Sequence, residues 1–419
     1  MRGPLLMSTK ERRRLAKFEL VASGTLTLGE AALSLDLSYR QCRRSYQRFK
    51  ASGDAGLVHR RRGTVSNRRK PASVRVAVLE AYRERYEVCG PTLAAELLRE
   101  EGLAVDHETL RRWLLAEGLW RKSRKRNVHR TRRERRRQFG ALVQMDGSPH
   151  AWFGPDHKDA CLMNMVDDAT GTTLSRLANQ ETTEVAMETL WRWIDTYGIP
   201  QALYTDKKTV FVTDREPTPA EQLAGQKPLT TFGRACEKLG IEIITAHSPQ
   251  AKGRVERNHG VYQDRLVKLL ALREITTIEA ANVFLADGFV ANLNAKFTKC
   301  PAEALDAHIP VPGTLDLAEV FCWEDTRQVA KDWTVRHDNG YYQIAKENSP
   351  RPKPKDTVVV RTRLDGTRAL FYRGHALNAI ALPAPPPPPE SKVPPKNTAG
   401  EQGLPSKTKR KKTWRPNCT

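Results

Sequence analysis

Apolar residues recur at helical spacing through the first 63 residues and predict three short helices. Ser38 and Gln41 have the spacing of a capping box, so the third helix is expected to begin after Ser38. The predicted buried faces are Leu15, Phe18 and Val21; Leu28, Ala31 and Ala32; and Tyr39, Cys42, Tyr46 and Phe49. We therefore predict a helix–turn–helix module over residues 9–63.

The polar positions of the third predicted helix are rich in arginine and glutamine. They are Arg40, Gln41, Arg43, Arg44, Gln47 and Arg48. Arginine can pair with guanine and glutamine with adenine in the major groove, where a helix–turn–helix places its second helix. We expect these residues to contact DNA, together with Arg61 and Arg62 in the basic cluster that follows. The alternative is a solvated, charged helix face.

A second helical module is predicted over residues 72–120. Pro91 suits the first turn of one helix, and Asp106 suits the N-cap of the next. Val105 and Leu110 have the spacing of a hydrophobic staple around that cap. The module is either a second helix–turn–helix that contacts DNA or a spacer that packs on the first module.

Residues 139–300 alternate between strand-like and helix-like segments in the order β-β-β-α-β-α-β-α. The predicted strands are 141–145, 159–167, 172–178, 201–205 and 241–245, and the first two predicted helices are 185–197 and 229–239. Ser248 is expected to cap the last helix, with Pro249 in its first turn. Glu256 then lies about two turns into this helix.

Beyond residue 300 the chain changes to short alternating segments with turn residues between them. The predicted strands are 329–335, 341–344, 356–361 and 369–372, and the predicted turns are 338–340 and 365–366. We expect a small β-barrel over residues 310–382, which is compatible with either DNA binding or protein docking. Residues 383–419 contain a proline run and a basic stretch and are expected to form a disordered tail.

The charge of the chain is unevenly divided. The whole chain carries a formal charge of +22; residues 1–138 contain 34 Lys and Arg against 15 Asp and Glu, whereas residues 139–300 contain 17 against 20. Residues 121–138 are expected to be a basic linker that follows phosphates. This distribution indicates a basic part that binds nucleic acid and a separate part that concentrates carboxylates.

The cysteines and the apolar segments bear on the compartment. The seven cysteines are scattered and include no C-x-x-C pair, which argues against disulfides and against a zinc finger. We find no apolar segment with the features of a signal peptide or a membrane span. A cytoplasmic protein, associated with the nucleoid when bound to DNA, is expected.

Three carboxylates stand at chemically informative places in the central segment. Asp146 follows the first predicted strand, Asp206 follows the fourth, and Glu256 lies on the final helix, so all three can meet at one edge of the sheet. Metal-dependent phosphoryl transfer needs hard oxygen ligands for two Mg²⁺ ions about 3.5–4 Å apart. Asp167 and Asp168 are rival ligands, although a role in the turn that follows them is favoured.

The segments around these carboxylates resemble the three signature blocks of a DDE core of the retroviral-integrase type. They are Gln-Met-Asp-Gly-Ser-Pro-His at 144–150, Tyr-Thr-Asp at 204–206 and Ser-Pro-Gln-Ala-Lys-Gly-Arg-Val-Glu-Arg-Asn at 248–258. Over roughly residues 9–380 the chain is similar to bacterial insertion-sequence transposases of the ISNCY type. The resemblance implies a ribonuclease-H-like α/β core in which Asp146, Asp206 and Glu256 hold two Mg²⁺ or Mn²⁺ ions.

The same resemblance implies a reaction and its partners. It implies hydrolysis that frees a 3′-hydroxyl at an element end, followed by attack of that hydroxyl on target DNA. The partners would be the terminal inverted repeats, the target duplex and further copies of the chain that bring two ends together. Lys252 would be a DNA contact close to the catalytic site.

The chain departs from the family pattern in two respects. Lys207 and Lys208 follow Asp206, where relatives commonly have Asn-Gly. The separation of 50 positions between Asp206 and Glu256 exceeds the common family spacing, and residues 213–228 have the composition of an insertion. A surface insertion adds little loop-closure entropy and should leave the site intact.

Two other functions fit parts of the pattern. A DNA-binding regulator derived from a transposase would keep the fold without catalysis, but the three carboxylates are all present. A ribonuclease acting on RNA–DNA hybrids would share the core fold, but it would not need two helical modules and a basic linker in front.

Overall fold

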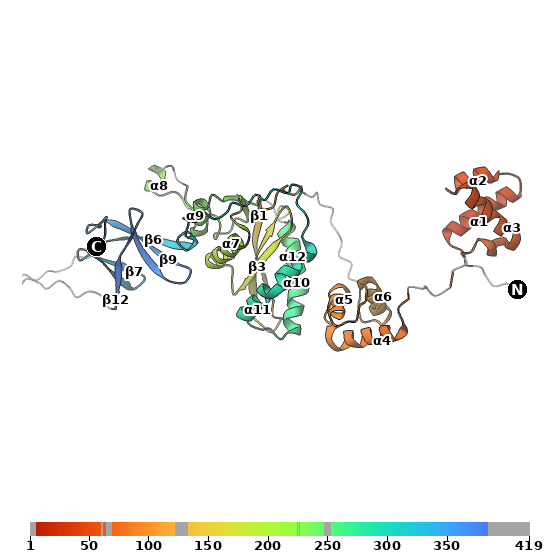
Figure 1. Ribbon diagram of the computed structural model, residues 1–419, viewed down its shortest axis with the longest axis horizontal. Coiled ribbons are helices and arrows are strands. Elements are labelled where there is room, and N and C mark those ends of the chain that lie inside the picture. Colours follow the sequence, from red (N-terminus) through yellow and green to blue (C-terminus); the bar gives the residue numbers. More distant parts are fainter. Residues whose placement is uncertain are drawn as a thin grey trace, which may run out of the picture. The chain divides into compact units, whose positions relative to one another are not determined.

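The computed structural model describes residues 6–59, 62–63, 69–121, 133–223, 225, 227–246 and 253–383. The chain divides into two compact units, Met1–Lys125 and Arg126–Thr419 (Figure 1). None of the described helices is long and apolar enough to cross a bilayer.

The predicted helix–turn–helix module is present and consists of α1 (Thr9–Ala22), α2 (Leu28–Ser34) and α3 (Tyr39–Ser52). Each helix begins with a complete capping box, and the one at Ser38 lies where the sequence predicts it. Phe18, Ala31 and Cys42 form the centre of the core, as predicted. The prediction that Tyr39 is buried was wrong, since it is 57% exposed. Periodicity assigns a residue to a helix face but does not say where along the helix the covering neighbours end.

A tight turn closes the third helix of this module. The short 3-10 segment Gly53–Leu57 follows α3 and buries Leu57 in the same core. At Gly56 a Cβ atom would lie 2.2 Å from the carbonyl oxygen of Arg48. Only glycine allows this close approach of the two backbone segments.

The second helical module also matches its prediction. It contains α4 (Ala72–Ala81), a π-helical segment (Tyr82–Tyr86), α5 (Pro91–Glu100) and α6 (His107–Ala116). Asp106 accepts hydrogen bonds from the backbone N–H groups of Glu108 and Thr109 at 3.0 and 3.3 Å, so it caps α6 as expected. Val105 and Leu110 are both buried beside this cap.

The central domain is built on a five-stranded sheet with the order β3-β2-β1-β4-β5. Strands β1 to β3 form an antiparallel meander, whereas β4 and β5 run parallel to β1. The strands are β1 (Val143–His150), β2 (Ala160–Asp167), β3 (Thr173–Ala178), β4 (Ala202–Thr205) and β5 (Glu242–Thr245). The predicted ribonuclease-H-like order of elements is confirmed.

Helices cover both faces of this sheet (Figure 1). The first face packs on α7 (Thr183–Tyr197) and α9 (Thr231–Lys238). The other face packs on α10 (Gly253–Leu272), α11 (Ile278–Phe284), the kinked segment Leu285–Phe289 and α12 (Val290–Phe297). Met163 and Met165 of β2 point to the first face, and Leu162 points to the second. This alternation assigns every residue of β1 and β2 to one face or the other.

The predicted insertion at 213–228 is a surface excursion between β4 and α9. It contains the short helix α8 (Pro219–Leu223), and Arg215 forms an ion pair with Glu221 at 2.7 Å. The excursion is thus closed by its own contacts.

The C-terminal region is rich in strands, as predicted, but its described residues form two sheets rather than one closed barrel. The sheet orders are β11-β10-β9-β6 and β12-β8-β7. The strands are β6 (Cys322–Gln328), β7 (Thr334–His337), β8 (Gly340–Ile344), β9 (Thr357–Arg363), β10 (Arg368–Tyr372), β11 (His375–Leu377) and β12 (Ala379–Leu382). One apolar core, including Val335 and Val360, lies between the sheets. Neighbouring strands therefore share a core without joining into one ladder.

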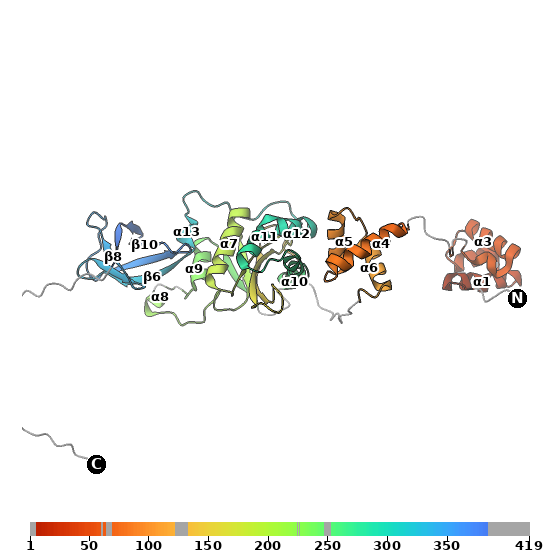
Figure 2. The same cartoon turned by 90° about the horizontal axis from the view of Figure 1, so that it is seen from below.

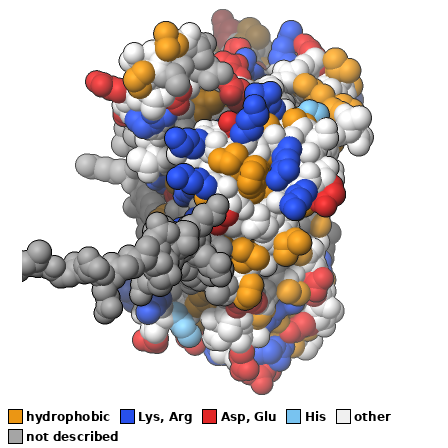
Figure 3. All heavy atoms as spheres, turned by 90° about the vertical axis from the view of Figure 1, so that its left-hand side faces the viewer, with side chains coloured by type: hydrophobic (Ala, Val, Ile, Leu, Met, Phe, Trp, Pro, Cys, Tyr) orange, Lys and Arg blue, Asp and Glu red, His pale blue; other side chains and the backbone are white. Residues whose placement is uncertain are grey.

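The C-terminal sheets are attached to the central domain through β6 and the short helix α13 (Leu317–Val320) (Figure 2). Phe321 is fully buried and stacks on Trp191 of α7, with ring centroids 5.7 Å apart. Lys238 of α9 contacts Glu324 of β6 at 2.7 Å. The face shown in Figure 3 carries several Lys and Arg side chains close to hydrophobic ones. In the C-terminal region, the guanidinium groups of Arg351 and Arg361 lie over the rings of Trp333 and Phe371, at 4.6 and 4.1 Å from the ring centroids.

Candidate active site

Asp146 and Asp206 are brought to neighbouring positions by the parallel pairing of β1 with β4. Val143 pairs with Leu203 and Gln144 with Tyr204, so Asp146 and Asp206 each lie two residues beyond the last pair, Asp146 within β1 and Asp206 just after β4. Adjacent strands lie about 4.8 Å apart. Asp146 has the same parity as Gln144 and therefore points to the α10 face of the sheet. The sequence placed Asp146 at the end of its strand, but the strand continues to His150.

Glu256 lies in the first turn of α10, on an exposed part of the helix, whereas the sequence placed it about two turns in; the predicted cap at Ser248 and Pro249 lies outside the described residues. The buried side chain of Gln144 ties this turn to β1, since its Oε1 accepts a hydrogen bond from the backbone N–H of Val255 at 3.2 Å. One turn further, Asn258 Oδ1 accepts a hydrogen bond from Asn164 of β2 at 2.7 Å. The first turns of α10, which carry Glu256, are thus bonded directly to β1, the strand of Asp146, and to the neighbouring strand β2.

Asp168 is a buried anion that bonds to β1, to α10 and to the segment before β1. Its carboxylate accepts hydrogen bonds from Gln144 Nε2 at 3.1 Å and from the backbone N–H of Arg136 at 2.8 Å. It also pairs with the guanidinium groups of Arg254 at 2.5 Å and of Arg133. Burial lowers the pKa of Arg254, and the charge of Asp168 opposes that effect. The side chain that precedes Glu256 by two positions is therefore held by a fully buried carboxylate.

Asp167 has the turn role that the sequence favoured. It accepts hydrogen bonds from the backbone N–H and the hydroxyl of Thr170, at 2.6 and 2.7 Å, and from the backbone N–H of Gly140 at 3.0 Å. Burial nevertheless raises its pKa. The carboxylates of Asp167 and Asp168 are both engaged in structural hydrogen bonds and ion pairs. Asp146, Asp206 and Glu256 therefore remain the candidate metal ligands.

Two residues that the sequence did not single out join the carboxylate cluster. Glu181, just before α7, accepts a hydrogen bond from Lys208 Nζ at 2.6 Å, and the same ammonium lies 3.2 Å from Asp206 Oδ2. Burial raises the pKa of Glu181, and that of Lys208 is raised by Glu181, Asp206 and Asp146 against the effect of burial. The departure from the family pattern at Lys207 and Lys208 was the only signal in the sequence that pointed here.

The cluster has the chemistry of a divalent-cation site, although it is not closed around one. Within the part of the chain that the structure describes, no group of three His, Cys, Asp or Glu side chains is close enough to hold a metal ion. The donors are nevertheless hard carboxylate oxygens, and a lysine ammonium stands between two of them. Glu181 Oε1 is buried without a hydrogen-bond partner beside this ammonium. The residues present therefore fit a cation.

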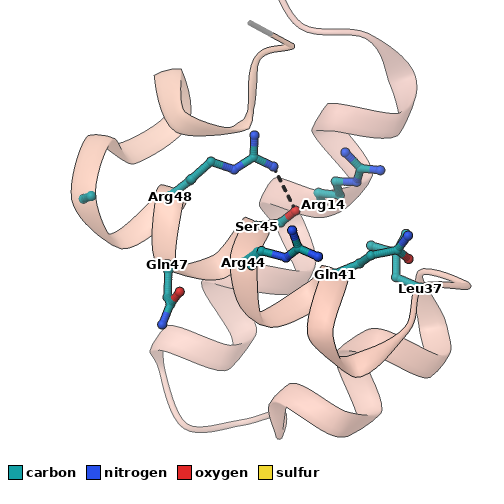
Figure 4. Close-up of a pocket in the computed structure, with 8 residues that line it drawn as sticks. Arg14, Leu37, Gln41, Arg44, Ser45, Gln47 and Arg48 are labelled. Atoms are coloured by element: carbon teal, nitrogen blue, oxygen red, sulfur yellow. Dashed lines mark hydrogen bonds between the residues drawn. The ribbon is translucent and has the colours of Figure 1, made fainter.

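The predicted DNA-reading residues lie mostly on the open side of α3. Arg40, Gln41, Arg43, Arg44 and Gln47 are exposed, and Arg48 is half-buried. A hollow of about 770 Å³ runs along this side and is lined by Arg14, Leu37, Gln41, Arg44, Ser45, Gln47, Arg48 and Ala51 (Figure 4). Arg14 of α1 was missed by the sequence reasoning, because its own helix pattern marks only an exposed position.

Two of the predicted DNA contacts also make bonds within the module. Gln41 Oε1 accepts a hydrogen bond from the backbone N–H of Ser38 at 3.2 Å and so belongs to the helix cap. Arg62 forms an ion pair with Glu11 at 2.5 Å and thereby ties the end of the module to α1. Arg61 and Lys252 lie outside the described residues.

Glu11 gives this module a predictable response to acid. Its carboxylate accepts hydrogen bonds from the backbone N–H groups of Ser8 and His59, at 2.7 and 2.9 Å. Chiefly the Ser8 bond, with help from His59 and Arg62, lowers the pKa of Glu11 to about 2. A folded-state pKa below the unfolded value means that the stabilisation is present above the unfolded value and is lost as the pH falls from about 4.5 towards 2.

We expect hydrogen exchange in α1 and at His59 to accelerate over that pH window in the full chain, after correction for the intrinsic rate. In a Glu11→Gln variant the window should disappear, because the amide does not titrate. A Glu19→Gln variant, which alters an exposed position of the same helix, should retain it. An identical acid response in the wild type and Glu11→Gln would contradict the assignment.

The predicted basic linker is partly structural. Residues 122–132 are outside the described part, but residues 133–137 fold back onto the central domain. Arg135 donates hydrogen bonds to the carbonyl oxygens of Asp168 and Ala169 at 3.2 and 2.9 Å, and Arg133 contacts the Asp168 carboxylate. This end of the linker was predicted to follow phosphates. In the structure, Arg133 pairs with the buried carboxylate of Asp168, and Arg135 bonds to two backbone carbonyl oxygens. Residues 133–137 therefore pack with the central domain.

Comparison with known proteins gives the family. "Putative transposase y4bF" of Sinorhizobium fredii (strain NBRC 101917 / NGR234) is 37% identical over 379 residues, covering 90% of this chain and 81% of the relative. The transposase for insertion sequence IS1202 of Streptococcus pneumoniae is 31% identical over 325 residues, and the match covers 68% of this chain and 68% of the relative. The chain belongs to the insertion-sequence transposases.

The N-terminal part of this transposase matches a family model described as a helix–turn–helix domain, over residues 13–63. The match falls on α1, α2 and α3, which the sequence predicted for this role. The protein is thus a DNA-binding transposase that acts in DNA transposition, a polynucleotidyl transfer in the general sense.

Retroviral integrases are among the solved structures that resemble this chain. The simian T-cell lymphotropic virus intasome in complex with PP2A regulatory subunit B56 gamma matches 73% of this chain and 99% of its own chain at 17% identity and a TM-score of 0.33. The catalytic core of BIV integrase matches 41% and 91% at 22% identity and a TM-score of 0.28. With scores this low, the fold of the transposase core is defined by its strand order and helix placement.

Proposed function

We propose that this transposase cuts DNA at the ends of its element and joins the freed 3′-hydroxyls to target DNA, using Asp146, Asp206 and Glu256. The observation that supports it best is the parallel pairing of β1 with β4, since Asp146 and Asp206 each follow the last pair by two residues and Asp146 has the parity of Gln144, which bonds to the helix that carries Glu256. Carboxylates so arranged suit in-line displacement at phosphorus, where negative charge builds up on the attacking and leaving oxygens.

Asp146, Asp206 and Glu256 would hold the divalent ions, two Mg²⁺ or Mn²⁺. When bound, such ions neutralise the phosphate charge and lower the pKa of a coordinated water or hydroxyl. The chain's own residues do the positioning. Gln144 and the Asp168–Arg254 pair hold the start of α10 against β1, so that Glu256 is carried by a fixed backbone.

DNA is bound by parts of the chain that do not take part in the chemistry. The arginines and glutamines of α3, joined by Arg14, would read the terminal repeats from the hollow beside that helix. Arg62 is tied to Glu11, so we assign it to the fold of the module; Arg61 stays in the proposal as a phosphate contact and Lys252 as a contact near the site. Two ends would be joined by a homo-oligomer assembled on DNA.

The proposed reaction can be tested with the purified full-length transposase and a duplex that carries the terminal repeats of its element. In Mg²⁺ we expect strand breaks with free 3′-hydroxyls at the repeat ends, then covalent joining to a supercoiled target. Chelation of the metal should stop both steps. Absence of cutting on a duplex that the protein demonstrably binds would contradict the proposal.

Arg44 and Gln47 should carry much of the sequence recognition. Replacing both with Ala is expected to weaken binding to the terminal repeats by about 2–4 kcal/mol, since each good base contact is worth about 1–3 kcal/mol. Binding to random duplex should fall much less. The measurement is a salt titration of both affinities by fluorescence anisotropy.

The matched control is Arg12→Ala, which removes a positive charge from an exposed position of α1 outside the hollow. It should lower both affinities slightly and leave their ratio unchanged. If Arg44→Ala with Gln47→Ala lowered both affinities equally, α3 would be a phosphate-binding face and not the reading helix.

A further inference from the structure

Glu181 is a buried carboxylate that the triad does not account for. Its side chain is only 10% exposed, and Oε1 has no hydrogen-bond partner. It comes from the segment between β3 and α7 and so approaches the sheet from the face opposite α10. Leaving a carboxylate oxygen buried and unpaired costs free energy unless a cation is close by. The cation beside it is the Lys208 ammonium, 2.6 Å from Oε2.

Gly147 makes this approach possible. A Cβ atom at that position would lie 2.2 Å from Glu181 Oε2 and 3.1 Å from Cys161 Sγ. The residue next to Asp146 thus has no side chain where the Glu181 carboxylate passes over β1. Glycine here lets the Glu181 carboxylate approach β1 from the α7 side, whereas the neighbouring Asp146 faces α10.

Lys208 engages Asp206 at both of its oxygens. Its ammonium lies 3.2 Å from Oδ2, and its backbone N–H donates a hydrogen bond to Oδ1 at 3.2 Å. The same ammonium contacts Glu181, so one positive charge is shared by two carboxylates from separate segments of the chain. A divalent ion that takes Asp206 as a ligand must compete with this charge.

We propose that the Lys208 ammonium acts as an internal cation, which pairs with Asp206 when no divalent ion is bound. When Asp206 binds a divalent ion, the ammonium stays paired with Glu181. The inference rests on the proposed function, because Asp206 is taken there as a metal ligand. Lys208 holds two like charges together in the resting protein, and Glu181 keeps the displaced ammonium nearby afterwards. Both are positioning residues, since neither needs to touch DNA.

The test is a titration of the full-length protein with Mn²⁺, followed by water-proton relaxation in the absence of DNA. Lys208→Met removes the competitor and should bind Mn²⁺ about three- to fivefold more tightly, the upper range that one partly exposed ion pair supplies. In Glu181→Gln the Lys208 ammonium can pair only with Asp206, so it competes more strongly with the metal. This variant should bind Mn²⁺ about threefold more weakly than the wild type. In the double variant the two effects should not add, and affinity should match that of Lys208→Met.

Lys207→Met is the matched control, because it removes the same charge from the adjacent, exposed position. It should leave the Mn²⁺ affinity within about twofold of the wild type, since exposed charges interact weakly through water. If the two lysine variants changed the Mn²⁺ affinity equally, the loss of any nearby positive charge would explain the effect, and the proposal would be overturned. So would a loss of affinity on adding Glu181→Gln to Lys208→Met, which would make Glu181 a direct ligand.

Asp206→Asn separates this inference from the proposed function. If that variant binds Mn²⁺ as the wild type does, the assignment of Asp206 itself fails. If it loses binding while Lys208→Met and Glu181→Gln behave as the wild type, the triad stands and the internal cation does not. Thermal unfolding of each variant shows whether the fold is retained, and Gln and Met are close in size to the residues that they replace.

Discussion

Glu256→Gln is expected to lower strand cutting and joining by at least about 10³-fold, because charge stabilisation by a bound metal is worth several kcal/mol. DNA affinity should stay within about twofold of the wild type, because the residues proposed to read DNA belong to the N-terminal modules. The fold should also survive. Glu256 is exposed, and its helix is held by Gln144, Asn258 and Arg254 rather than by its own carboxylate.

The measurement is single-turnover cutting of a labelled repeat-end duplex at saturating protein, with binding measured separately on the same duplex. Glu279→Gln is the matched control, since it makes the same exchange at an exposed position in the first turn of α11. It should cut at the wild-type rate. Mg²⁺-dependent cutting by Glu256→Gln at more than about a tenth of that rate would remove Glu256 from the triad.

Much of the fold was predictable because local signals coincide with it. The helix caps at Ser38 and Asp106 lie where the sequence predicts them, and β2 is a mostly apolar strand that is buried along its whole length. The C-terminal region was harder. Residues 329–335 were expected to form one strand, but Trp333 has a positive φ of 59° and the strand β7 begins only at Thr334. Alternation of residue types cannot register a backbone reversal of that kind.

The triad was predictable for a different reason from the residues that support it. Asp146, Asp206 and Glu256 sit in sequence blocks that are recognisable on their own. Glu181 is brought to the cluster only by the sheet, 35 positions after Asp146 in the chain, and its neighbours give no motif. A contact made by tertiary packing leaves no trace in the spacing of residues, so it could not be foreseen.

Asp168 shows the same limit with a larger energetic consequence. The sequence assigned it to a turn, together with Asp167, yet the structure makes it the anion on which β1, α10 and residues 133–136 converge. Its charge compensates Arg254, whose side chain is only 14% exposed. Asp168 does lie in the turn after β2, but only the Asp167 side chain bonds within that turn, whereas the Asp168 side chain bonds to Gln144, Arg136 and Arg254.

Asp168→Asn is therefore expected to destabilise the central domain by about 3–5 kcal/mol, the cost of leaving a buried cation without its partner. The loss should appear in the unfolding transition of the Arg126–Thr419 unit, measured by calorimetry of the full chain, and not in that of the N-terminal helices. Cutting should fall as well, because the start of α10 loses its anchor. Asp195→Asn, an exposed aspartate on α7, is the control and should change stability by less than about 0.5 kcal/mol.

A second substitution distinguishes loss of the charge pair from simple damage to the core. Adding Arg254→Met to Asp168→Asn removes the orphaned cation, so the double variant should be more stable than Asp168→Asn alone, since buried ion pairs can be exchanged for apolar groups at little cost. Cutting should not recover with stability, because the tie from Arg254 to the carbonyl oxygen of Arg133 is also gone. If the double variant were the less stable of the two, Asp168 would act through its hydrogen bonds to Gln144 and Arg136 rather than through charge.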